Sequence, residues 1–294
     1  MSKQPRVIGG QVAAITGGAR GIGQATAQAL VQEGMRVAIG DLDLERARAT
    51  AEQLGGGTVA FELDVTDRAS FERFVDEAEG ALGPLDVLVN NAGIMPIGCF
   101  TEEDDLTAAR MVDINCHGVV YGMKIVLPRF EARGRGHLVN IASTAGKGGF
   151  PGGATYCGTK HFVVGVSEAV RAELSETEIE VSCVMPGVVN TELADGLVEG
   201  RGVKKVEPGD VAAEIVSALK QPRFDVFVPR SIGPITKVLN VLPRAGREAV
   251  ARFLKADQIL LEADPDARRE YERRAAQSEP GLEAGGETPE KIAG

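Results

Sequence analysis

The chain has 294 residues, of which 44% are hydrophobic and 25% are charged, as is usual for a globular protein with a large core. Its formal net charge of -10 argues against nucleic-acid binding, which needs a surplus of Lys and Arg on one face. The four cysteines are widely spaced, with no CxxC pair and no His at metal-ligand spacing, so we expect neither a metal site nor a disulfide framework. The first residues lack the apolar segment of a signal peptide, and no run of about 18 apolar residues occurs, so we expect a cytoplasmic protein.

Short β-branched runs alternate with longer helical patterns along the chain. The runs are residues 11–16, 37–40, 58–62, 85–90, 137–142, 180–185 and 225–228. Several are apolar almost throughout, as is typical of parallel strands that helices cover on both faces. The alternation predicts one α/β domain over residues 1–230, built on a doubly wound, seven-stranded parallel sheet.

Two of the helical patterns are long. The first begins near the acidic run at residues 102–105, which is favourable at a helix N-terminus, and we expect it to end before Pro128. The second begins after the Pro-Gly-Gly of residues 151–153 and should run to about Leu174.

The composition changes after the last predicted strand. Residues 231–255 contain five basic side chains and one acidic side chain, with Val250, Phe253 and Leu254 at helical spacing. We expect residues 231–267 to form a helical extension that is a lid or an oligomer contact, or that lies on an anionic membrane surface through residues 231–261. Gly, Pro, Glu and Ala dominate residues 268–294, which predicts a mobile tail.

A glycine-rich turn follows the first predicted strand and leads into a helical pattern. It reads Thr-Gly-Gly-Ala-Arg-Gly-Ile-Gly over residues 16–23. Glycines let the backbone approach a pyrophosphate, whose charge is stabilised by the N–H groups at the helix start. The order of strand, turn and helix therefore indicates a dinucleotide site.

An acidic residue, Asp41, ends the second predicted strand, 18 residues beyond Gly23. A carboxylate there would bond the adenosine ribose hydroxyls and repel a 2′-phosphate, which favours NAD over NADP. Arg20 in the glycine turn points the other way, because a guanidinium there could bind that phosphate. Alternatively, Arg20 is only a surface partner of Asp41.

Three further residues indicate proton chemistry. Tyr156 and Lys160 are four apart on a predicted helix, which places them one turn apart on one face. A nearby ammonium stabilises a tyrosine phenolate, so this pair is a candidate acid/base, although the spacing alone is also that of an ordinary helix face. Ser143 follows the strand at residues 137–142, where it either holds a substrate oxygen or caps the turn at residues 144–146.

With these motifs in order, the chain resembles the short-chain dehydrogenase/reductase family from about Val12 to Pro229. The matching residues are Thr16 to Gly23, Asp64-Val65, Asn90-Asn91-Ala92-Gly93, Asn115, Ser143, Tyr156 with Lys160, and Pro186-Gly187 with Thr191. The resemblance implies a Rossmann-type domain that transfers a hydride between a nicotinamide cofactor and a small alcohol or ketone. It also implies a homodimer or homotetramer, in which Gly158 and Gly165 of the second long helix permit close approach of a second copy.

The resemblance also implies where the cofactor binds. Asp64 and Val65 would border the adenine, and Thr191 would help to hold the nicotinamide carboxamide. Asn91, Ala92 and Gly93 would steady the sheet edge. The implied cofactor-binding set is Gly17, Arg20, Gly21, Ile22, Gly23, Asp41, Asp64, Val65, Asn91, Ala92, Gly93, Tyr156, Lys160, Pro186, Gly187, Val189 and Thr191.

By the same resemblance the active tetrad is Asn115, Ser143, Tyr156 and Lys160. Tyr156 would be the general base in oxidation and the general acid in reduction, while Lys160 would bond the nicotinamide ribose and lower the pKa of Tyr156. Ser143 would bind the substrate oxygen, and Asn115 would hold a water that links Lys160 to solvent. The leading hypothesis is an NAD-dependent dehydrogenase of apolar or lipid-like secondary alcohols. An NADPH-dependent carbonyl reductase and a non-catalytic NAD-binding sensor or interaction protein are the alternatives.

Overall fold

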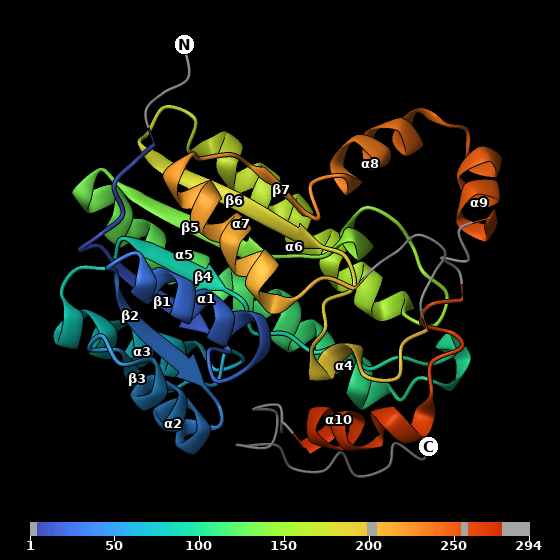
Figure 1. Ribbon diagram of the computed structural model, residues 1–294, viewed down its shortest axis with the longest axis horizontal. Helices are drawn as coiled ribbons and strands as arrows, with labels where there is room; N and C mark the ends of the chain where they lie inside the picture. The colour runs from blue at the N-terminus through green and yellow to red at the C-terminus, as the bar shows by residue number, and fades with distance from the viewer. Residues whose placement is uncertain (1–4, 199–204, 254–257, 278–294) are drawn as a thin grey trace, which may run out of the picture.

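The computed structural model describes residues 5–198, 205–253 and 258–277. Seven parallel strands form one sheet in the order β3-β2-β1-β4-β5-β6-β7 (Figure 1). Their bounds are β1 Val12–Thr16, β2 Arg36–Asp41, β3 Val59–Glu62, β4 Val87–Asn90, β5 Gly136–Ile141, β6 Ile179–Pro186 and β7 Asp225–Val228. All seven lie where the sequence predicts strands, so the doubly wound α/β fold is confirmed.

Helices cover both faces of the sheet. One face is packed by α1 (Gly21–Gln32), α2 (Leu44–Leu54) and α7 (Pro208–Lys220), and the other by α3 (Arg68–Leu82), α5 (Gly118–Arg133) and α6 (Ala154–Glu173). The largest fully enclosed side chains include Phe71, Phe74 and Phe130, and burying one such side chain stabilises a fold by about 1.5–3 kcal/mol. Because apolar helices cover both faces, ligands reach the sheet at the ends of its strands.

Aspartates fix where several helices begin. The side chains of Asp43, Asp67 and Asp104 each accept a hydrogen bond from a backbone N–H in the first turn of α2, α3 and α4 (Asp105–Val112), respectively. Such caps satisfy amides that have no partner within the helix. The start of α4 agrees with the acidic run that predicted it.

The first long helix departs from its prediction at two places. A π-helical turn, Asp113–His117, separates α4 from α5, and α5 continues past Pro128 to Arg133. The predicted end before Pro128 is therefore wrong. Proline removes one helical hydrogen bond, but here α5 packs against α3 and β5, and tertiary packing stabilises a helix more than a single bond does. The second long helix, α6, begins and ends as predicted.

Three helices follow the sheet: α8 (Ile232–Val241), α9 (Arg244–Phe253) and α10 (Pro265–Gln277). Figure 1 shows α8 and α9 beyond the end of the sheet. The mobile tail expected from residue 268 is wrong for residues 268–277, which belong to α10. The prediction rested on the scarcity of large apolar side chains, but this helix is held by the polar contacts of Arg268.

Some predictions fall outside the described residues, namely those on Leu254 and on residues 278–294. Within the described part of the chain, no helix is long and apolar enough to cross a membrane.

Candidate active site

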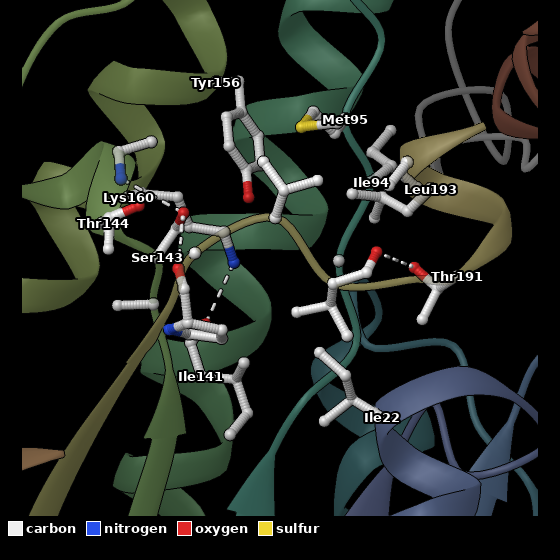
Figure 2. Close-up of a pocket in the computed structure, with 18 of the residues that line it drawn as sticks. Ile22, Ile94, Met95, Ile141, Ser143, Thr144, Tyr156, Lys160, Thr191 and Leu193 are labelled. Atoms are coloured by element: carbon white, nitrogen blue, oxygen red, sulfur yellow. Dashed lines mark hydrogen bonds between the residues drawn. The ribbon is translucent and has the colours of Figure 1, made fainter. Parts of the chain in front are cut away.

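A cavity of about 1620 Å³ opens at the carboxyl ends of the strands. Its lining includes Gly17 after β1, Asp41 at the end of β2, Asn91 after β4, Ser143 after β5 and Gly187 after β6. Figure 2 shows Tyr156 and Lys160 on one side of this pocket, with Ile94, Leu193 and Thr191 across from them. Ligands of open α/β sheets bind at this edge.

The glycine turn has the shape that a phosphate cradle needs. Gly17 and Gly21 have φ angles of 63° and 55°, a backbone region that favours glycine. A Cβ on Gly23 would lie 2.2 Å from the Gly17 carbonyl oxygen, so only glycine lets α1 approach β1 this closely. No side chain caps α1, which leaves its first N–H groups for a ligand.

Asp41 is held at the end of β2 by two backbone amides. Its Oδ2 accepts from the Ala19 N–H at 3.0 Å and its Oδ1 from the Asp43 N–H at 3.1 Å. Arg20 forms ion pairs with Asp43 at 3.4 Å and with Glu192 at 3.3 Å, so the alternative that pairs Arg20 with Asp41 is wrong. Asp41 lines the cleft, and no ion pair to it occurs among the described residues.

The segment after β4 is tied to the end of β1. The Asn91 Nδ2 donates to the carbonyls of Thr16 and Gly17 at 2.9 and 3.0 Å, and the Thr16 Oγ1 accepts from the N–H groups of Asn91 and Ala92. These bonds fix the floor of the cleft between two neighbouring strands. On the adenine side implied by the resemblance, Asp64 accepts from Thr66 at 2.8 Å.

Tyr156 and Lys160 are both buried, one turn apart on α6. The Lys160 Nζ lies 5.7 Å from the centre of the Tyr156 ring and donates to the Ile141 carbonyl at 3.0 Å. Burial raises the pKa of Tyr156 to about 12, which the Ser143 hydroxyl opposes, and burial lowers the pKa of Lys160 to about 8. So weak an acid needs a neighbouring cation to lose its proton near neutral pH, and Lys160 is the cation beside it.

Asn115 lies in the π-helical turn behind the cavity wall. Its Nδ2 donates to the Ile94 carbonyl at 2.9 Å and to the Thr159 Oγ1 at 3.1 Å, and its Oδ1 accepts from the Ile94 N–H at 2.9 Å. These bonds compensate a buried amide that is unfavourable within a regular helix. Asn115 thereby joins the segment after β4 to α6.

The Ser143 hydroxyl has two roles open to it. It accepts from the Ala145 N–H at 3.1 Å, which is the turn-capping role, and it lies 3.5 Å from the Pro186 carbonyl oxygen. The long second contact leaves its proton free to bond a substrate oxygen.

The structure brings nearly all of the predicted site residues to one cavity. Among the four tetrad residues, Ser143, Tyr156 and Lys160 line it, and Asn115 does not. Among the cofactor residues only Gly23 lies behind the lining, packed against Gly17. Pro186 at the end of β6, and Gly187, Val189 and Thr191 after it, line the same cavity.

Two residues of α10 that no sequence pattern singled out also reach this region. The Arg268 side chain is 2% exposed and donates to the carbonyls of Met95, Leu193 and Asp195 at 2.8, 3.1 and 3.0 Å. The Tyr271 hydroxyl lines the cavity and accepts from the Met95 N–H at 2.6 Å. Thus α10 joins the segment after β4 to the segment after β6.

A signal for α10 was present in the sequence. Arg268 and Glu272, and likewise Glu270 and Arg274, are four residues apart and form ion pairs. Opposite charges at this spacing support a helix even where large apolar residues are few.

A family model described as short chain dehydrogenase matches residues 11–202. The chain belongs to the short-chain dehydrogenase/reductase family. It is therefore an oxidoreductase of a family that binds a nicotinamide cofactor.

Curated relatives cover most of the dehydrogenase domain. A sorbitol dehydrogenase of Cereibacter sphaeroides is 41% identical over 191 residues, 65% of this chain and 75% of that protein. A 3-alpha-(or 20-beta)-hydroxysteroid dehydrogenase of Mycobacterium tuberculosis is 35% identical over 215 residues, 71% of this chain and 83% of that protein. A glycine betaine reductase of Emericella nidulans is 37% identical over 227 residues, 73% of this chain, but the match spans only 18% of that longer protein.

A solved structure gives the same fold. The short-chain dehydrogenase/reductase of Burkholderia phymatum in complex with NAD superimposes with a TM-score of 0.74 at 25% identity. The match covers 80% of this chain and 94% of the Burkholderia chain.

Proposed function

We propose that this short-chain dehydrogenase/reductase transfers a hydride between NAD and an apolar or lipid-like secondary alcohol or ketone. The observation that carries the proposal is the placement of Ser143, Tyr156 and Lys160 on one wall of a cavity whose opposite edge holds a glycine cradle. The roles below are those that this geometry supports.

The cleft fits a dinucleotide. The uncapped start of α1 and the close approach at Gly17 and Gly23 suit a pyrophosphate, and Asp41 suits the adenosine ribose. Val189 and Thr191 follow β6 and line the same cavity as Tyr156, so a nicotinamide between them would lie beside Tyr156. When bound, the nicotinamide ring supplies the hydride donor or acceptor.

Tyr156 moves the proton. Its phenol, with a pKa of about 12, is protonated near neutral pH, which is the form that reduction of a carbonyl requires. In oxidation the phenolate takes the proton of the alcohol, and the Lys160 ammonium stabilises that phenolate. The Ile141 carbonyl keeps Lys160 beside Tyr156.

Ser143 and Asn115 assist this pair. The Ser143 hydroxyl donates to the substrate oxygen while its own oxygen is fixed by the Ala145 N–H. Both N–H groups of the Asn115 amide are used within the protein, so a water that links Lys160 to solvent would bond an oxygen of Asn115.

The substrate side of the cavity is apolar. Met95, Met111, Leu197 and Leu260 cluster with Tyr156, and α8 adds Ile235 and Leu239 to the lining. The hydroxysteroid dehydrogenase among the relatives supports an apolar substrate. Because residues of α8 and α9 line the cavity, the lid interpretation of the extension is better supported than the membrane one.

NAD is favoured over NADP by the charges around Asp41. Arg20 and Arg46 line the same cavity as Asp41 and both pair with Glu192, at 3.3 and 3.5 Å, which opposes their use for a 2′-phosphate. An NADPH-dependent carbonyl reductase is the second candidate, because those arginines would bind a phosphate once Glu192 moved away.

A homo-oligomer is part of the proposal. A Cβ on Gly158 or Gly165 would meet no heavy atom within 4 Å, so these glycines of α6 do not pack on the chain's own sheet. They leave a surface on which a second copy can pack closely.

A screen of apolar alcohols with NAD and of ketones with NADH, read by nicotinamide absorbance, tests the function, and parallel titration with NADP and NADPH tests the cofactor. Turnover with NAD and NADH supports the proposal. Preference for NADPH favours the reductase, and NAD binding without any turnover favours a sensor.

A further inference from the structure

Arg110, on α4, is a largely buried cation, and no partner for it occurs among the described residues. Its residue is 9% exposed, and it lines the same cavity as Tyr156 and Lys160. Its Nε is fully enclosed and has no hydrogen-bond partner. Within residues 5–198, 205–253 and 258–277, its guanidinium has neither an ion pair nor a hydrogen bond.

The buried Arg268 and the partly buried Arg129 are both paired. Arg268 donates to three backbone carbonyls and to Glu272, and Arg129 bonds the carboxylates of Asp76 and Glu79, each at 2.6 Å. The chain contains 42 Asp and Glu residues, so carboxylates are not scarce. The exception at Arg110 therefore calls for a reason other than stability.

A largely buried guanidinium without a partner destabilises the folded chain. Arginine stays protonated at any pH at which the protein is folded, so it cannot escape the cost by losing its proton. Withdrawing a guanidinium from water without a partner is unfavourable, and an oxyanion in the cavity would offset that cost with charged, often bidentate, hydrogen bonds.

The surroundings of Arg110 indicate what carries that oxyanion. The next residue, Met111, is fully buried in the apolar cluster that holds Met95 and Tyr156. In the proposed function the phosphates of a dinucleotide bind at the uncapped start of α1, and Arg110 lies on a different element, α4. An anion at Arg110 would thus be attached to an apolar body on the side of Tyr156.

We propose that Arg110 binds a carboxylate or phosphate group of the substrate, so that the substrate class is an apolar secondary alcohol or ketone with an anionic end. The assignment of this ligand as a substrate rests on the proposed function. The binding site itself is independent of turnover.

Calorimetry with matched ligands tests the site. The probes are decanoate, decyl phosphate and the neutral decanamide, added to the full chain with and without NADH. We expect the wild type to bind the two anions at least tenfold more tightly than decanamide. Arg110→Met and Arg110→Gln should abolish that difference, and Arg110→Lys should retain part of it.

Arg73→Met is the matched control, because Arg73 is 66% exposed on α3 and does not line the cavity. It should keep the full preference for anions. Equal affinity of the wild type for decanoate, decyl phosphate and decanamide would overturn the proposal without any variant. That comparison stands even if an Arg110 variant fails to fold.

The NADH titration separates the two sources of an oxyanion. If Arg110 serves the substrate, the Kd of NADH stays within twofold of wild type in Arg110→Met. A tenfold rise in that Kd with an unchanged preference for decanoate would assign Arg110 to the cofactor and overturn the substrate assignment. Anion preference without turnover of any alcohol would contradict the proposed function but would still support an anion-binding site at Arg110.

Discussion

Arg268 and Tyr271 of α10 together satisfy both backbone polar groups of Met95. The Arg268 Nη2 donates to the Met95 carbonyl at 2.8 Å, and the Tyr271 hydroxyl accepts from the Met95 N–H at 2.6 Å. Met95 packs in the apolar cluster with Tyr156, and Arg268 also donates to the carbonyl of Leu193, which lines the cavity. A helix from the far end of the chain therefore fixes two walls of the substrate region.

Replacing Arg268 should loosen these walls without touching the proton chemistry. We expect Arg268→Gln to raise the KM for the alcohol by about tenfold or more with little change in kcat, since one hydrogen bond to a charged group contributes about 1.5–3 kcal/mol. Steady-state kinetics measures both constants. Arg269→Gln is the control because Arg269 is 78% exposed, and an equal effect of the two variants would refute the role of Arg268.

Asp41 should set the cofactor preference. Asp41→Asn removes the carboxylate that repels a 2′-phosphate, so the ratio of kcat/KM for NADPH over NADH should rise on the order of tenfold. The exposed Glu45→Gln on α2 should leave the ratio unchanged. An unchanged ratio in Asp41→Asn would show that Asp41 does not discriminate between the cofactors.

Burial of the Lys160 ammonium beside Tyr156 should lower the free energy of unfolding at neutral pH. Its pKa is about 8 in the folded chain and about 10.5 when unfolded, so the unfolded state binds more protons between these values. Wild-type stability should accordingly rise from pH 8 to pH 10.5, and the burial cost is complete below pH 8.

Lys160→Met removes this cost along with activity. Urea denaturation should show the variant gaining more free energy of unfolding, relative to wild type, at pH 7 than at pH 10. Lys124→Met, at an exposed position of α5, should show no such difference. A gain that is equal at both pH values would contradict the buried titration of Lys160.

The extension should act as a lid rather than as a membrane contact. Ile232, Ile235 and Leu239 of α8 line the cavity, as residues of a lid would. We expect the full chain and a chain truncated before Ile232 to co-sediment equally weakly with phosphatidylserine liposomes. Retained NAD binding by the truncated chain is the control, and stronger recovery of the full chain would favour the membrane interpretation.

The sequence predicted the sheet because its strands are short apolar runs between helical patterns. Runs that are apolar almost throughout fit strands that are buried on both faces of a sheet. The site followed for a related reason. Ser143 and Asp41 stand at strand ends, so the parallel sheet itself brings them to one edge. The proximity of Tyr156 and Lys160 could be predicted from their four-residue spacing on one helix.

Contacts between distant segments were not accessible in this way. Arg268 meets Met95 and Leu193 through backbone carbonyls, which every residue has, so no sequence pattern marks its partners. The end of α5 was missed because Pro128 is tolerated by tertiary packing. Arg110 could not be identified from the sequence, because its distinguishing feature is the lack of a partner among the described residues of the folded chain.

Tyr156→Phe tests the central claim most directly. It removes one hydroxyl from a buried ring, and Tyr121→Phe on α5 is the matched control. With a substrate found by screening, NAD-dependent oxidation should lose a factor of about 100 or more in kcat in Tyr156→Phe, while the Kd of NADH stays near that of wild type. Wild-type turnover by Tyr156→Phe would contradict the account.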